Sequence, residues 1–106
     1  MIRRLVRSWR QRVAVAGHSM EPTLRDGDWL LVDPDARLAL GDLVVARDGE
    51  RLVVKRVVDI DDGGRVLLGS DNPNHAGQRV GPLDESQIVG RAWLRYWPPT
   101  RLGRVV

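Results

Sequence analysis

The sequence predicts a mainly β, barrel-like single domain built from short strands, and three observations support this fold class. Short apolar runs alternate with clusters of Asp, Asn, Gly and Pro, which is the pattern of strands and turns in small barrels and sandwiches. Valine and leucine dominate the apolar residues and phenylalanine is absent, which suits a core of branched strand residues. The length of 106 residues is sufficient for one small core and short for two domains.

Six strands are expected, at Val13 to Ala16, Trp29 to Val32, Leu43 to Ala46, Leu52 to Val58, Val66 to Leu68 and Ile88 to Tyr96. Asp48-Gly49 and Gly63-Gly64 have the chemistry of hairpin turns. The stretch from Glu21 to Arg25 can form one helical turn at most. The longest predicted loop runs from Gly69 to Glu85, and loops of this length are usually functional or mobile. No strand pattern resumes after Pro98-Pro99, so residues 99–106 are expected to form a flexible tail or a partner-dependent arm.

Composition excludes several classes of function. The chain has no cysteine and only two histidines, so neither disulfides nor a resident metal or other cofactor is expected. No run approaches the eighteen apolar residues of a membrane-spanning helix. The net charge of +3 includes five arginines within residues 1–12, so the remainder is close to balanced and nucleic acid is not an expected partner.

Residues 1–12 form a basic N-terminal segment without the apolar core of a secretory signal. Ile2, Leu5, Val6 and Trp9 have helix-like spacing opposite the arginines. The segment therefore suits contact with an anionic membrane surface or an acidic partner, and equally an ordinary solvated terminus. The expected location is cytoplasmic, or peripheral at the inner face of the membrane.

Sixteen of the seventeen basic side chains are arginine, and the single lysine, Lys55, lies inside an apolar run. Arginine keeps its proton at any ordinary pH, whereas burial can make a lysine neutral and able to accept a proton. Alternation along a strand places Val53, Lys55 and Val57 on one face and Arg56 on the other. Lys55 is therefore a candidate general base, although retention of one lysine by chance would give the same composition.

The candidate nucleophile is Ser19, which lies between a short strand and a proline-directed turn in Gly17-His18-Ser19-Met20-Glu21-Pro22. Gly17 would let the backbone approach a ligand, and the turn leaves N–H groups available for an oxyanion. A serine in this position can also act only as a cap for backbone donors.

Four motifs in order resemble those of the signal peptidase and SOS-repressor group of Ser-Lys peptidases. They are Ser19-Met20-x-Pro22-Thr23-Leu24, Gly41-Asp42-x-Val44-Val45, Lys55-Arg56-Val57 and Gly69-Ser70-Asp71-Asn72-Pro73, which has one extra residue. The resemblance extends over residues 13–98, which we take as the peptidase domain. Within the group, Asp28 to Val32 and Val89 to Pro98 are most similar to the proteases that mature nickel-type superoxide dismutase.

The resemblance implies that Ser19 attacks a peptide bond while Lys55 accepts its proton. It also implies oxyanion and cleft support from six residues, namely Gly17, Met20, Pro22, Ser70, Asp71 and Asn72. Family members often carry a serine that orients the lysine shortly after the last motif, where this chain has Ala76. Either Ser70 or Asn72 would then orient Lys55, or the chain would be an inactive homologue.

Other groupings are weaker. His18 adjoins Ser19 and points to the opposite side of an extended chain, and a triad of Ser19, His75 and Asp71 would depend on a loop histidine. The expected activity is removal of an N-terminal extension from a precursor protein in trans, with nickel-type superoxide dismutase as the leading substrate. The alternatives are signal-peptidase-like removal of export signals and a non-catalytic protein-binding homologue.

Overall fold

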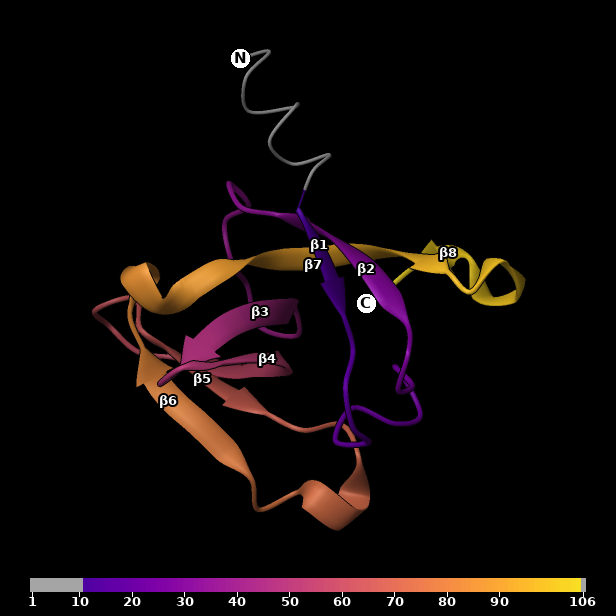
Figure 1. Cartoon of the computed structure of the whole chain (residues 1–106). Coiled ribbons are helices and arrows are strands. Elements are labelled where there is room, and N and C mark those ends of the chain that lie inside the picture. The colour runs from indigo at the N-terminus through magenta and orange to yellow at the C-terminus, as the bar shows by residue number, and fades with distance from the viewer. Residues whose placement is uncertain (1–10, 106) are drawn as a thin grey trace.

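Residues 11–105 are described by a computed structural model, in which eight strands form one antiparallel sheet (Figure 1). The strands are β1 (Arg12–Ala14), β2 (Trp29–Asp33), β3 (Leu43–Asp48), β4 (Arg51–Ile60), β5 (Val66–Gly69), β6 (Arg79–Leu83), β7 (Ile88–Trp97) and β8 (Gly103–Arg104). Neighbours follow the order β1-β2-β7-β3-β4-β5-β6, and β8 pairs with β7. The sheet curls into a barrel-like shape whose end strands, β1 and β6, are not neighbours. The predicted mainly β class is confirmed.

All six expected strands are present, with shifted ends, whereas β6 and β8 were not predicted. β6 lies in the second half of the expected long loop. It was not predicted because its Gly81-Pro82 pair interrupts the strand pattern. It pairs with β5 at the end of the strand order, and proline is tolerated in such edge strands. The remaining loop contains a short 3-10 helix, η1 (Pro73–His75), and a second one, η2 (Glu85–Gln87), precedes β7.

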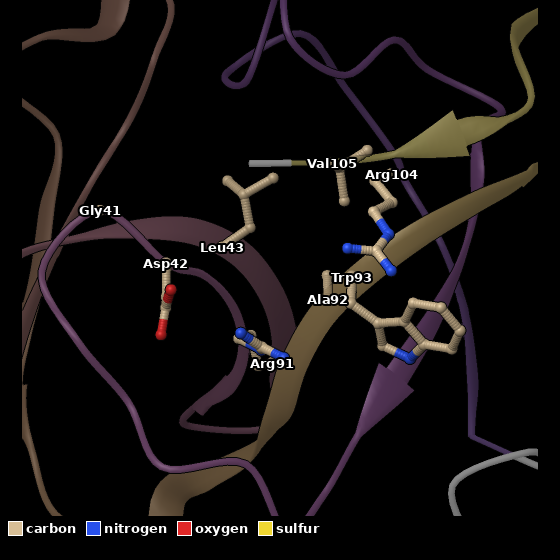
Figure 2. Close-up of a pocket in the computed structure, with 8 residues that line it drawn as sticks. All are labelled: Gly41, Asp42, Leu43, Arg91, Ala92, Trp93, Arg104 and Val105. Carbon is tan, nitrogen blue, oxygen red and sulfur yellow. The ribbon is translucent and has the colours of Figure 1, made fainter.

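The C-terminal segment differs from the expected flexible tail. A 3-10 helix, η3 (Pro99–Arg101), leads into β8, and Val105 is buried in the same cluster as Leu43 (Figure 2). The Arg101 guanidinium donates to both carboxylate oxygens of buried Asp28, at 2.8 and 2.9 Å. The segment is too short to show strand alternation, and its pairing with β7, the ion pair of Arg101 and the burial of Val105 hold it against the sheet.

The hairpin between β3 and β4 sets the register of the lysine strand. Gly49 has a φ of +63°, a conformation that glycine adopts without strain, and it lies in the two-residue connection between these strands. Leu43 then pairs with Arg56 and Val44 with Lys55. Lys55 is 7% exposed, so the prediction that it points inward is confirmed, while Arg56 is partly exposed.

Two apolar clusters form the core. One contains Met20 and Leu24, which follow Ser19 and are 2% and 0% exposed, together with Val15, Leu30, Leu43, Ala92 and Val105. The other lies between β3, β4, β5 and β6. Burial of side chains such as Met20 and Leu24 stabilises a fold by about 1.5–3 kcal/mol each. The turn that carries Ser19 is therefore anchored to the core from its far side.

Candidate active site

The serine turn follows β1 and is shaped by local hydrogen bonds. Gly17 has a φ of +85°, and its N–H donates to Asp26 Oδ1 at 2.8 Å. The Leu24 N–H donates to the Met20 carbonyl at 2.9 Å, which closes a single turn where one was expected. Because Met20 and Leu24 face the core, Ser19 between Gly17 and Met20 stays partly exposed.

Ser19 and Lys55 are thirty-six residues apart in sequence and adjacent in space. Lys55 Nζ lies 2.7 Å from Ser19 Oγ and 2.9 Å from Ser70 Oγ. Burial, and secondarily the positive charge of Arg51, lowers the pKa of Lys55 from its ordinary value of 10.5. A lysine that loses its proton more easily, and already touches a hydroxyl, has the two properties that a general base requires.

Ser70 and Asn72 have different partners, which separates the two candidates for orienting Lys55. Ser70 accepts a hydrogen bond from Lys55 Nζ, whereas Asn72 holds the serine turn. The Asn72 backbone N–H donates to the Ser19 carbonyl at 2.9 Å, and its side-chain amide donates to the His18 carbonyl at 2.8 Å. The hydroxyl beside the lysine thus comes from the extra residue in the last motif.

Asp71 connects the lysine strand to the serine turn. Its carboxylate accepts from Arg56 Nε at 2.8 Å, from an Arg56 terminal nitrogen at 2.7 Å and from the Thr23 hydroxyl at 2.6 Å. These bonds, chiefly that from Arg56, lower the pKa of Asp71 below its usual value. Since Arg56 adjoins Lys55 and Thr23 follows Ser19 by four residues, this bridge fixes the separation of the lysine strand and the serine turn.

Of the other residues predicted to support the oxyanion or the cleft, some lie where that role requires and others do not. No acceptor within residues 11–105 takes the Ser19 backbone N–H, so it can receive an oxyanion. The Gly17 N–H already donates to Asp26 Oδ1, and glycine has no side chain that could supply a second donor to the oxyanion. Met20 lines the cleft beside Ser19, whereas Pro22, which follows a cis peptide bond, is exposed and does not line it.

Ser19 and Lys55 open into a cleft of about 550 Å³ between β1 and β4. Its lining is mainly apolar and includes Val13, Ala14, Val15, Ala16, Met20, Trp29, Leu52, Val53 and Val54, with Arg12 and Arg51. Among residues 11–105, β1 pairs with β2 only and the β4 residues before Lys55 pair with β3 only, so within this part of the chain each strand has a free edge. An extended peptide can hydrogen-bond to such an edge.

Neither histidine forms a Ser-His-Asp triad with Ser19. His18 Nδ1 lies 3.3 Å from Glu21 Oε1, and His75 Nδ1 lies 3.1 Å from Gln78 Oε1. The Asp71 carboxylate is occupied by Arg56 and Thr23 rather than by His75. Among the described residues, no group of three His, Cys, Asp or Glu side chains could hold a metal ion.

A smaller cavity of about 240 Å³ lies between β3, β7 and β8 (Figure 2). Its lining includes Arg91 and Trp93 of β7 and Arg104 of β8, and Arg91 Nε is buried with no hydrogen-bond partner among residues 11–105. Its lining carries charges of both signs, because Asp42 faces it as well as the two arginines, and the described residues that line it include no serine, threonine or cysteine nucleophile. The Ser19 cleft therefore remains the candidate active site.

Comparison with known proteins identifies the family of the chain. Residues 11–93 match the model of the Peptidase S24-like family. The chain belongs to this family. The mitochondrial inner membrane protease subunit 1 of Xenopus tropicalis is 30% identical over 86% of this chain and 71% of its own length. The probable thylakoidal processing peptidase 2 of Arabidopsis thaliana is 32% identical over 76% of this chain, which spans only 23% of that relative. Signal peptidase I of Streptococcus pneumoniae is 48% identical over 43% of this chain and 24% of its own length.

Sequence reasoning did not single out Thr23 as a partner of Asp71 or Arg51 as a neighbour of Lys55. Thr23 belonged to the quoted serine motif, which was its only signal, and Arg51 precedes Lys55 by four residues on the same strand. No helix among residues 11–105 has the length and apolar character needed to cross a bilayer. The basic segment lies outside the described residues except for Arg12 and its neighbour Gln11.

Proposed function

We propose that this chain is a serine endopeptidase that uses Ser19 as nucleophile and Lys55 as general base. The observation that carries the proposal is the 2.7 Å separation of Lys55 Nζ and Ser19 Oγ in a cleft open to an extended chain. Membership of a peptidase family, and relatives named as signal and processing peptidases, support the same reaction class.

Neutral Lys55 has two N–H donors and one lone pair. One N–H is directed to Ser70 Oγ, and the lone pair accepts the Ser19 hydroxyl proton as Oγ attacks the substrate carbonyl carbon. The Ser19 N–H stabilises the oxyanion that forms. Lys55 then gives its proton to the departing amine, which leaves an acyl group on Ser19. Water attacks this ester while Lys55 accepts its proton and returns it to Ser19 Oγ.

The substrate class is a precursor protein that carries an N-terminal extension, cut in trans. The sequence resemblance over Asp28 to Val32 and Val89 to Pro98 favours the precursor of nickel-type superoxide dismutase, with nickel belonging to the substrate. The second candidate is removal of export signals at a membrane surface, which the names of the relatives favour.

The experiment compares two substrates and three proteins. Purified chain is incubated with a nickel superoxide dismutase precursor or with a preprotein that carries an export signal, and new N-termini are identified by mass spectrometry. Ser19→Ala and Lys55→Arg should both lose cleavage, the second because arginine cannot become neutral. Cleavage by both variants at the wild-type rate would show that the Ser-Lys assignment is wrong.

The choice between substrates follows from the same assay. Selective cleavage of the dismutase precursor supports the first candidate. Selective cleavage of the preprotein supports the second, especially if binding to anionic vesicles disappears on deletion of residues 1–12.

A further inference from the structure

The cleft is basic as well as apolar. Arg12 lies seven residues before Ser19 and Arg51 four residues before Lys55, and both arginines line the same cleft. Among the described lining residues there is neither aspartate nor glutamate. The apolar cleft therefore carries two permanent positive charges, those of Arg12 and Arg51.

Neither arginine is neutralised by a described residue. Asp48 pairs with Arg51 across the hairpin and Glu50 precedes it, but both acids are exposed, lie outside the cleft lining and form no ion pair with Arg51. The Arg12 guanidinium lies 5.9 Å from the centre of the Tyr96 ring, a contact that holds its position and leaves its N–H groups available. Both guanidinium groups can therefore receive a carboxylate, for which their planar geometry is well suited.

The distance along β4 between Arg51 and Lys55 sets how far the positive charge of Arg51 lies from the bond that is cut. Four residues of extended strand separate Arg51 from Lys55, which corresponds to roughly 13 Å at the usual rise per residue. A substrate that lies extended along β4 with its reactive carbonyl at Ser19 brings its fourth residue from that carbonyl close to Arg51. A basic side chain at the same point would face like charges.

We infer that the cleft selects substrates with an acidic side chain about four residues from the bond that is cut, bound chiefly by Arg51 and secondarily by Arg12. This inference rests on the proposed peptidase function and adds a specificity that the function alone does not require. Both guanidinium groups are exposed, so the pair with the substrate carboxylate is largely solvated and added salt weakens it.

The test uses peptides that share one cleavage segment and differ at a single position. Glu, Gln or Lys is placed at each of the second to sixth residues on either side of the cut bond, and kcat/KM is measured at low salt and at 0.5 M salt. Binding of the same peptides to the Ser19→Ala protein is measured by fluorescence anisotropy. The Glu peptide should exceed the Lys peptide by roughly tenfold near the fourth residue on one side, and the ratio should shrink with salt.

Charge reversal supplies the decisive comparison. Arg51→Glu should invert the Glu-to-Lys ratio, and Arg12→Glu should reduce it. Any effect of Arg51 on Lys55 basicity acts on all peptides alike and cancels in the ratio. Arg37→Glu is the matched control, because Arg37 is exposed and lines a different cavity, and it should leave the ratio unchanged.

The outcomes separate the two proposals. Equal cleavage and equal binding of Glu and Lys peptides at every position would overturn the inference while leaving the peptidase intact. Failure of wild-type protein to cut any peptide would count against the proposed function, and the binding ratio would still support or overturn acidic selection.

Discussion

Replacement of Asp71 by asparagine tests whether the bridge to Arg56 and Thr23 holds the two halves of the site together. Asp71→Asn keeps the shape of the side chain, removes its charge and presents an amide to three N–H and O–H donors. Hydrogen bonds to a charged group contribute about 1.5–3 kcal/mol each, and loss of one partner of a buried pair costs about 3–5 kcal/mol. The Asp71 and Arg56 side chains are 15% and 22% exposed, so solvent compensates part of this loss.

We expect Asp71→Asn to lower the free energy of unfolding by about 2 kcal/mol, between the values for exposed and buried pairs. In a domain of this size that corresponds to a fall of roughly 8–16 °C in Tm, measured by circular dichroism. The kcat should also fall at temperatures well below Tm, because the bridge sets the separation of Ser19 and Lys55. Glu21→Gln is the control, since its partner His18 and Glu21 itself are 67% and 38% exposed, and it should change Tm little.

The bridge also predicts how the Tm difference between wild type and Asp71→Asn changes with pH. Because Arg56 lowers the pKa of Asp71, the carboxylate stabilises the fold above its unfolded pKa of about 3.9, and this contribution is lost as pH falls through the lower folded value. The Tm difference between wild type and Asp71→Asn should therefore be complete at pH 7 and shrink below about pH 4. A difference no larger than that of Glu21→Gln, or one that does not change in acid, would refute the account of the bridge.

Three further predictions concern the lysine and the buried carboxylate. Ser70→Ala should lower kcat by about tenfold to a hundredfold with little change in KM, because Lys55 loses one of its two hydroxyl partners, and Ser70→Thr should restore part of the rate. Lys55→Met should raise Tm at pH 7, because burial lowers the pKa of Lys55 and a charged Lys55 therefore opposes folding. The increase in Tm should shrink as pH rises towards 10.5, where lysine loses its charge in the unfolded chain as well. A lower Tm for Lys55→Met at pH 7 would contradict this account of Lys55. Asp28→Ala should lower the free energy of unfolding in urea by about 3–5 kcal/mol, because Arg101 loses its buried acceptor; a loss below about 1 kcal/mol would contradict that role.

The sequence was sufficient for the fold class and for the inward position of Lys55 on its strand. Alternation around Lys55 and the turn residues around Ser19 are local signals, and each survives in the structure as the sequence suggests. β6 could not be predicted because Gly81-Pro82 breaks its strand pattern, although it pairs with the preceding strand, β5. The packing of Val105 likewise depends on contacts from distant strands.

Within the site, the limits of sequence reasoning were set by long-range pairing. The resemblance pointed to a missing serine near Ala76, and the sequence left Ser70 and Asn72 as equal substitutes. Only the fold shows that the Ser70 hydroxyl is beside Lys55, whereas Asn72 bonds to the backbone around Ser19. The partnership of Thr23 with Asp71 spans forty-eight residues and leaves no periodic signal in the chain.

The rate at which Ser19 becomes acylated, followed against pH by intact-protein mass spectrometry with an activated peptide ester, tests the central proposal most directly. If Lys55 is the base, a single acyl group should form on Ser19, and its rate should rise with a midpoint below 10.5, the ordinary lysine pKa. Lys55→Arg should abolish this rise because arginine stays charged. Acylation of another residue, or the same pH profile in Lys55→Arg, would contradict the Ser-Lys mechanism.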